Sequence, residues 1–269
     1  MIQEVKKKKM RPETQERILS IASPIAILIF WQILSWISIY TPYVILDRRF
    51  IPSPITIMEA AYKLVSSREL EQHVGISLYR LSLGFLIGAV PGVIIGMIMG
   101  LSRWVRAVID PVVAATYPIP KIAILPILML FLGIGDASKL AVIAIAVIFL
   151  VLINTMVGVL TLDPIYFDVA KNYGANWSKL FRRVILPGAL PLIFAGLRLG
   201  LGVSLIVIVA AEFVAAKSGI GYLIWTSWET LIVENMFVGI IVITVLGIVT
   251  TRLLHEVEML IIPWKRERQ

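Results

Sequence analysis

Long apolar runs separated by short polar segments dominate this chain. Each run is about 20 residues long or slightly longer, which is the length of helix that crosses the hydrocarbon core of a bilayer. Because a helix satisfies its backbone hydrogen bonds internally, such runs predict membrane-spanning α-helices. The sequence therefore predicts an all-α membrane protein with about six spans, at 18–40, 76–101, 107–132, 139–161, 189–212 and 236–258.

Two of these runs depart from the simple pattern. The run 18–40 follows a cluster of lysines, as in a signal peptide, but it is longer than a signal peptide's apolar region. No small-residue cleavage pattern follows it, so we interpret it as a retained first span. The run 107–132 is expected to be an interrupted helix, because proline removes a helical hydrogen bond. Its prolines are Pro111, Pro118, Pro120 and Pro126.

Basic residues predict the orientation of the spans. Lys and Arg gather at 1–17, in the loop 162–188 and at 259–269, and basic loops stay on the cytoplasmic side. Both termini are then cytoplasmic. The expected organisation is a cytoplasmic N-terminus (1–17), a first span with an outer segment (18–75), a transmembrane core that includes the loop (76–258), and a cytoplasmic tail (259–269).

The composition agrees with a membrane protein. Apolar residues make up 59% of the chain and charged residues 16%, and the mean hydropathy is +0.91. Soluble domains are about half apolar and a quarter charged. The net charge of +8 does not indicate nucleic-acid binding, because the basic residues flank apolar runs and no nucleic-acid motif accompanies them. With no cysteine and two histidines, no metal site is expected.

The segment 54–66 has helical spacing of its apolar residues, with Ser53 as a cap and Pro54 at the first helical position. It predicts a short amphipathic helix on the outer surface. A plain connecting helix, without a part in substrate handling, is the interpretation we favour.

Small residues recur every four positions in the second and fifth spans. Such residues let two helix backbones approach closely. They predict either packing inside the chain, which we favour, or a subunit interface or moving seam. The residues are Gly84, Gly88, Gly92, Gly96 and Gly100, followed by Gly196, Gly200 and Ser204.

The loop 162–188 is polar and basic between two apolar runs. Asp163 and Pro164 predict a helix start, and Gly174 permits a left-handed stop. A second helix is expected from Ser178. Three breakers, Pro187, Gly188 and Pro191, are expected to interrupt the chain before the fifth span. The loop therefore predicts a compact pair of helices facing water and a protein partner.

The spacing in this loop resembles that of bacterial ABC importer permeases, E-A-A-x3-G-x9-I-x-L-P. Asp168 stands at the Glu position, Val169 and Ala170 at the two Ala positions, and Gly174 at the Gly position. Further segments are similar to the nitrate/sulfonate/taurine/bicarbonate group of these permeases. The remaining loop matches are Val184, Leu186 and Pro187, and the further segments are 51–54, 73–80, 119–126, 133–139, 186–191, 196–200 and 211–213.

This resemblance implies a fold, partners and a mechanism. The fold is the type I ABC importer permease architecture. Two permease copies, two ATPase subunits and an extracytoplasmic binding protein assemble in the bacterial inner membrane. The short loop helix is a coupling helix that docks on the ATPase. The implied coupling residues are Asp168, Val169, Ala170, Gly174, Ala175, Leu186 and Pro187. ATP and Mg²⁺ bind the ATPase and not this chain, which also lacks the G-x-x-x-x-G-K-[ST] phosphate loop.

The implied cargo is a small solute. A sulfonate, taurine, nitrate or bicarbonate anion is the first expectation, and a thiamine-precursor-like or other organic solute is the alternative. Two other classes were weighed. An intramembrane enzyme would need a complete H-E-x-x-H, but Met259 stands at the fifth position after His255 and Glu256. A stand-alone secondary transporter would need inverted repeats and carboxylates at mid-span, which the sequence does not offer.

Polar residues inside the spans are candidates for the transport pathway: Tyr117, Lys121, Asn154 and Arg198. Arg198 lies about ten residues, or roughly 15 Å, into its span. It is expected either to attract an anionic solute or, as we favour, to pair with a neighbouring carbonyl or carboxylate. Lys121 and Tyr117 belong to the proline-broken span, where such backbone lines cavities. Asn154 is expected to bond across helices. Glu212 is expected to gate the outer side or, preferably, to bond backbone amides of the loop that follows it.

Overall fold

The structure, a computed structural model, describes residues 12–37 and 50–264. Every regular element in these two ranges is a helix. The helices are α1 (Pro12–Ile37), α2 (Pro54–Ser66), α3 (Glu69–Leu101), α4 (Arg103–Thr116), the 3₁₀ turn η3 (Lys121–Ile124), α5 (Leu125–Leu132), α6 (Asp136–Leu160), α7 (Pro164–Asn172), α8 (Trp177–Leu180), the π-helical turn η4 (Phe181–Ile185), α9 (Leu186–Ala215), α10 (Ile220–Glu229) and α11 (Val233–Ile261).

Four helical stretches in the described ranges are long and apolar enough to cross a membrane. They are α3, α6, the continuous stretch Trp177–Val214 and α11. These four confirm the spans predicted at 76–101, 139–161, 189–212 and 236–258. The first predicted span, 18–40, corresponds to α1, whose apolar helix Ile25–Ile37 is shorter than a span. Its residues 38–40 lie outside the described ranges, so this span stays a prediction.

The run 107–132 is not one straight span. The helix α4 and the segment Lys121–Leu132 meet at an angle of 89°. Pro118 and Pro120 lie in the break, which is where a missing N–H and a fixed φ disrupt helical bonding most easily. Pro126 lies in the first turn of α5, where proline is tolerated. The bent pair is either one broken span, in addition to the four above, or a re-entrant loop.

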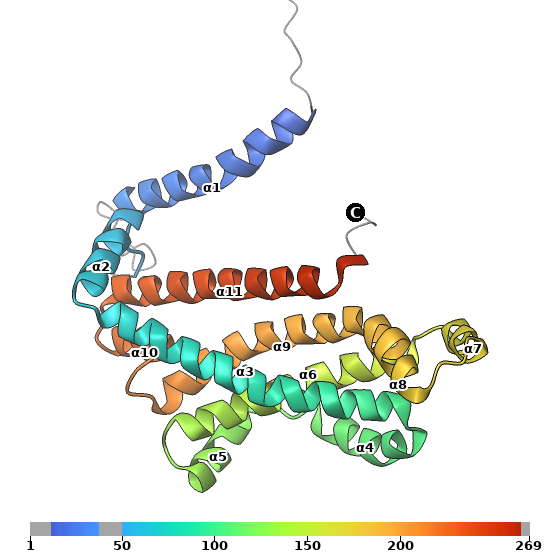
Figure 1. The fold of residues 1–269 in the computed structure, drawn as a ribbon. Coiled ribbons are helices and arrows are strands. Elements are labelled where there is room, and N and C mark those ends of the chain that lie inside the picture. The colour runs from blue at the N-terminus through green and yellow to red at the C-terminus, as the bar shows by residue number, and fades with distance from the viewer. Residues whose placement is uncertain (1–11, 38–49, 265–269) are drawn as a thin grey trace, which may run out of the picture.

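The core lies where α6 packs against both α3 and α9 (Figure 1). The glycine face of α3 is turned to α6. A Cβ atom added at Gly84 would lie 2.9 Å from the Cβ of Ile143, and one added at Gly92 would lie 3.0 Å from the carbonyl oxygen of Ile148. The prediction that these small residues serve packing inside the chain is therefore confirmed.

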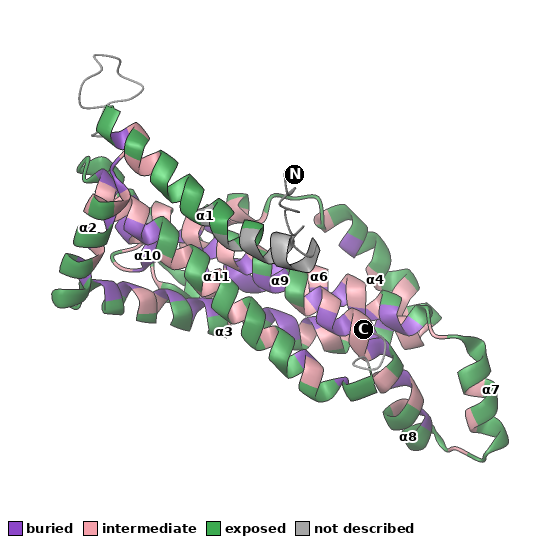
Figure 2. Ribbon diagram, turned by 90° about the horizontal axis from the view of Figure 1, so that it is seen from above, coloured by how far each residue is buried: buried purple, intermediate pink, exposed green. Residues whose placement is uncertain are grey.

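The fifth span uses the same device against α6. A Cβ at Gly196 would lie 2.8 Å from the Cβ of Asn154, and a Cβ at Gly200 would lie 3.2 Å from Val147. Because α6 is gripped by glycine faces on both sides, α3, α6 and α9 form one tightly packed unit. Purple, buried positions follow these three helices in Figure 2.

The two ends of this unit carry different elements (Figures 1 and 2). At one end α2 lies across the ends of α3 and α11, beside α10. Its predicted cap is present, since Ser53 Oγ accepts a hydrogen bond from the Thr56 N–H at 3.2 Å. Its inner face, Ile57 and Leu64 among it, packs with Val238 of α11. At the other end α7 projects from the bundle, next to α8, with which the stretch Trp177–Val214 begins.

Candidate functional site

The loop between α6 and α9 builds its helix from local capping. Asp163 Oδ1 accepts a hydrogen bond from the Ile165 N–H at 2.9 Å, which caps the start of α7. At its end Gly174 adopts a φ of +67°, and the Ala175 N–H donates to the Ala170 carbonyl oxygen at 2.9 Å. This left-handed stop turns the chain sharply. The predicted helix start at Asp163 and Pro164 and the predicted stop at Gly174 are confirmed.

The second half of the loop differs from the prediction. A helix begins at Trp177, with Asn176 as its cap, and continues through η4 into α9. The break expected at Pro187, Gly188 and Pro191 is therefore wrong. In η4 the Leu186 N–H bonds to the Phe181 carbonyl, five residues back. This shifted bonding places Pro187 in the first turn of α9, where its missing N–H does not end the helix.

The projecting loop leaves several large apolar side chains uncovered. Tyr173 is 88% exposed, Trp177 62% and Ile165 58%. Exposed apolar side chains gathered on one projecting segment are typical of an interaction surface. Of the predicted coupling residues, Asp168, Val169 and Gly174 are exposed and Ala170 and Ala175 are intermediate. Leu186 and Pro187 are the first two residues of α9 and are also intermediate.

A groove of about 980 Å³ runs along the base of this loop. The start of α7 contributes Asp163 and Tyr166, and the start of α9 contributes Pro187 and Pro191. Trp264, which follows α11, closes it. The loop is therefore a projecting helix beside a hollow.

Arg198 has a carboxylate partner. It forms an ion pair with Glu258 of α11, and the His255 Nδ1 lies 3.8 Å from the same carboxylate. Glu258 is almost completely buried, whereas the Arg198 side chain is 46% exposed. The favoured expectation, that Arg198 pairs with a neighbouring carboxylate, is therefore confirmed. The pairing places Arg198 level with the last turn of α11.

Lys121 closes the break between α4 and α5. Its Nζ donates to the carbonyl oxygens of Thr116 at 2.9 Å, Tyr117 at 2.8 Å and Ile119 at 2.9 Å. An ammonium group has three donors, so all are used on the end of α4. The Nζ also lies 4.6 Å from the ring centroid of Phe149 in α6.

Asn154 does not bond across helices as expected. Its Nδ2 donates to the Leu150 carbonyl oxygen of its own helix at 2.8 Å. The four pathway candidates thus come from α4–η3, α6 and α9, and the polar groups of Lys121, Asn154 and Arg198 bond to separate partners.

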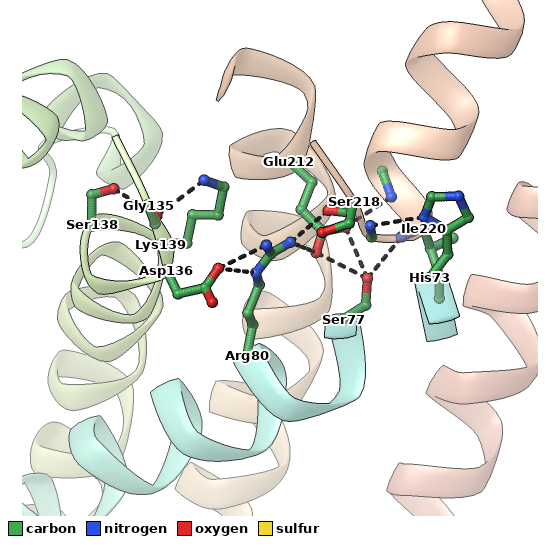
Figure 3. Close-up of polar contacts among 12 residues, drawn as sticks. His73, Ser77, Arg80, Gly135, Asp136, Ser138, Lys139, Glu212, Ser218 and Ile220 are labelled. Atoms are coloured by element: carbon green, nitrogen blue, oxygen red, sulfur yellow. Dashed lines mark hydrogen bonds and ion pairs between the residues drawn. The ribbon is translucent and has the colours of Figure 1, made fainter. Parts of the chain in front are cut away.

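A polar network that the sequence did not predict lies at the opposite end of the bundle from α7 (Figure 3). Arg80 of α3 is 4% exposed and uses all three guanidinium nitrogens. Its contacts are Asp136 Oδ1 at 2.7 and 2.8 Å, Glu212 Oε1 at 2.8 Å and the Ser218 carbonyl oxygen at 2.7 Å. One guanidinium therefore joins α3, α6, α9 and the segment before α10.

The carboxylate of Glu212 is also fully engaged. It is 1% exposed, accepts the Gly221 N–H at 2.8 Å, and lies 2.9 Å from the Ser77 Oγ. The prediction that Glu212 bonds backbone amides of the following loop is confirmed. The Ser77 Oγ in turn accepts the Ile220 N–H at 2.7 Å, and the His73 Nδ1 accepts the Gly219 N–H at 3.0 Å.

The sequence carried a partial signal for this network. Arg80 is a charge inside a predicted span, and such a charge needs a partner. The segments 73–80, 133–139 and 211–213, which resemble the permease group, contain most residues of this network. The sequence does not predict that these segments meet in space, because Ser77 and Glu212 are 135 residues apart.

These observations define a class: a multi-helix membrane protein with a projecting helical loop at one end that exposes apolar side chains. Comparison with known proteins identifies the family. Residues 92–258 match the binding-protein-dependent transport system inner membrane component family, and the chain belongs to it. It is therefore the permease component of an ABC transporter, an inner-membrane subunit with several apolar spans, and not the catalytic subunit. In such systems the ATPase is a separate subunit, and a binding protein is a further partner.

Relatives align over most of the chain. A putative aliphatic sulfonates transport permease protein of Bacillus subtilis is 34% identical over 242 residues, covering 90% of this chain and 86% of the relative. A taurine transport system permease protein of Escherichia coli is 31% identical over 263 residues, covering 96% and 94%. A nitrate import permease protein of Synechocystis is 31% identical over 222 residues, covering 79% and 81%.

A solved structure supports the fold. The crystal structure of an amino acid ABC transporter with histidines matches with a TM-score of 0.55 and 17% identity, covering 78% of this chain and 97% of that one. At this identity the likeness concerns the fold alone.

Proposed function

We propose that this chain is the permease subunit of an ATP-driven importer for a small anionic solute, with a sulfonate or taurine as the first choice and nitrate or bicarbonate as the second. The names of the relatives from Bacillus subtilis and Escherichia coli support the sulfonate class, and the Synechocystis relative supports an inorganic anion. Two copies of the chain form the pathway, with six spans each, the type I arrangement and both termini in the cytoplasm of a bacterial cell. The domain boundaries are those expected from the apolar runs.

The observation that carries this proposal is the projecting α7 with its exposed apolar side chains. Asp168, Val169 and Ala170 on that helix, with Gly174 just after its end, keep the spacing of a coupling loop. Covering such an apolar surface with a partner lowers the free energy, because the surface is removed from water. In our proposal the ATPase subunit covers α7, and ATP-driven closure of two ATPase subunits displaces it.

The route from the loop into the membrane supports the same assignment. From Trp177 to Val214 the chain is one helical stretch, without a break at Pro187. A displacement of the loop therefore reaches the packed unit of α3, α6 and α9 through a stiff element. Tyr117, which is 47% exposed at the broken helix, is our candidate for a surface of the pathway. Lys121 and Arg198 have structural roles instead, because Lys121 bonds carbonyl groups of the break and Arg198 pairs with Glu258 of α11.

The docking assignment is tested with Tyr173→Ala. Tyrosine is a frequent anchor at interfaces, so its truncation should weaken capture of the ATPase about tenfold or more. The matched control is Tyr62→Ala, since Tyr62 is 74% exposed on α2, at the other end of the molecule. The measurement is co-purification of the tagged permease with the ATPase encoded beside it. Equal capture by both variants would refute docking through α7.

The solute is tested by uptake into vesicles that hold the permease, its ATPase and its binding protein. Taurine, an alkanesulfonate, nitrate and bicarbonate are compared, with a neutral amino acid and a thiamine precursor as controls. Saturable, ATP-dependent uptake of a sulfonate supports the first choice. Uptake of the thiamine precursor with no anion uptake would overturn the anionic assignment.

A further inference from the structure

The two polar sites of this molecule lie at opposite ends of one helical stretch. The stretch begins at Trp177 beside the docking loop, and Glu212 lies two residues before its end at Val214. At 1.5 Å per residue, about 50 Å of helix separates the loop from Glu212. Any movement of α7 that is carried along this helix therefore arrives at the buried carboxylate of Glu212.

The contacts of Glu212 connect this arriving movement to three other elements. The Arg80 guanidinium binds Glu212 and also Asp136, the first residue of α6. We call Arg80, Asp136 and Glu212 the outer hub. The hub reaches α10 as well, because the Gly221 N–H donates to Glu212.

The start of α10 is held both by α3 and by the hub. Three successive backbone N–H groups, those of Gly219, Ile220 and Gly221, bond to His73, Ser77 and Glu212 respectively. Gly219 has a φ of +120°, and a Cβ atom there would enter the carboxyl group of Glu212. The segment is thus fitted against the carboxylate, and it moves when Glu212 moves.

The hub holds one positive and two negative charges, has Lys139 beside it, and is mostly closed to water. Arg80 and Glu212 are 5% and 1% exposed at their side chains, whereas Asp136 is 49% exposed. Lys139, also buried, donates to the Gly135 carbonyl oxygen at 3.0 Å, next to Asp136. Removing one charge from a buried ion pair leaves the other charge uncompensated, which is strongly destabilising. We therefore expect Arg80 and Glu212 to stay in contact when α9 moves.

We propose that Arg80 and Glu212 are positioning residues for transport, and that they couple the movement of α9 to the outer ends of α3, α6 and α10. This inference rests on the proposed function. With the hub intact, a displacement that enters at α7 rearranges the outer surface, where a binding protein releases its solute. With the hub broken, the ATPase still docks and hydrolyses ATP, but the outer side no longer responds.

The reverse direction follows from the same link. A binding protein that presses on the outer ends should stimulate ATP hydrolysis through the hub, because the hub joins those ends to α9 and the stretch containing α9 begins beside the docking loop. Stimulation by the binding protein is therefore a readout that a purely structural role would leave unchanged in correctly folded protein.

The test uses the full transporter in vesicles with three variants. Glu212→Gln keeps the shape and removes the charge. Arg80→Lys keeps the charge and removes the forked geometry. Asp136→Asn changes the half-exposed member, where loss of folding is not expected. The matched control is Glu229→Gln on α10, an exposed carboxylate that bonds only within its own helix, to Trp225 Nε1 at 2.8 Å.

Three quantities are measured for each variant: capture of the ATPase, ATP hydrolysis without binding protein, and stimulation of hydrolysis by the solute-loaded binding protein. For Glu212→Gln and Arg80→Lys we expect normal capture, unstimulated hydrolysis within about twofold of wild type, and a loss of stimulation of about tenfold or more. Asp136→Asn should lose stimulation by about threefold, because its pair is partly solvated. Glu229→Gln should behave as wild type.

The outcomes separate this inference from the proposed function. Wild-type protein that fails to capture the ATPase overturns the proposed function, and the hub with it. Normal capture with wild-type stimulation in Glu212→Gln overturns the hub alone. If Glu212→Gln does not fold, Asp136→Asn decides: reduced stimulation supports the hub, and unchanged stimulation refutes it.

Discussion

The close approach of α3 and α6 makes a sharp prediction for Gly88→Ala. A Cβ atom at Gly88 would meet the backbone of Ala144, with its carbonyl oxygen in direct overlap and its Cα at 2.9 Å. Backbone atoms cannot rotate away as a side chain can, so the two helices must separate locally. Gly75, on the same helix, offers a matched control, because a Cβ atom there meets nothing within 4 Å.

Gly75→Ala and Gly88→Ala are expected to change the stability of the protein in opposite directions. Alanine is favoured over glycine in a helix by about 1 kcal/mol, so Gly75→Ala should stabilise the protein by up to that amount. Gly88→Ala gains the same propensity but overpacks the interface, which costs about 1–3 kcal/mol, and backbone overlap belongs at the upper end. The two variants should therefore differ by about 2–3 kcal/mol, which corresponds to roughly 6 °C in melting temperature for a protein of this size.

The assay is thermal unfolding of the isolated chain in detergent, followed by size-exclusion chromatography. Gly88→Ala should melt below wild type and Gly75→Ala at or above it. If the two melt together while Gly88→Ala fails only to form dimers, the glycine face is a subunit interface and the packing argument fails.

Two further predictions concern the charged residues inside the spans. Arg198→Ala removes the ion pair with the buried Glu258 and should lower stability by about 1–3 kcal/mol. The double variant Arg198→Ala with Glu258→Ala should recover part of that loss, and a thermal double-mutant cycle measures the coupling. Uptake that falls for anions but not for neutral solutes would argue for a solute site instead. Lys121→Met should leave the three carbonyl groups at and after the end of α4 without their donor. A cysteine placed at Pro118 should then react with a water-soluble maleimide about threefold faster or more, whereas Lys121→Arg should keep much of the protection. Equal labelling of the two variants would contradict the role of Lys121 in closing the break.

Local patterns predicted much of this fold. Apolar length is a property of the chain itself, so four spans were readable as continuous stretches. The capping of α7 by Asp163 and its stop at Gly174 also depend only on near neighbours. The glycine spacing gave the packed face, because a repeat of four keeps one side of a helix small.

Longer-range and finer features were not readable. The continuity of the helix through Pro187 depends on the π-helical turn before it, and proline alone predicts a break. The hub around Arg80 required three distant segments to meet, and a single sequence gives no measure of such a meeting. Asn154 could satisfy its amide within its own helix, so the expected cross-helix bond was unnecessary.

The uninterrupted passage from Trp177 into α9 has a mechanical consequence. A hinge between a loop and a span passes on a pull but absorbs rotation. A helix without a hinge transmits torque as well, so a twist of the loop about the helix axis would turn the far end too. Glu212 lies at that far end, where the start of α10 packs closely against its carboxylate. A transporter built from this chain would therefore be sensitive to the angle at which its loop is gripped, and not only to the distance through which it is moved.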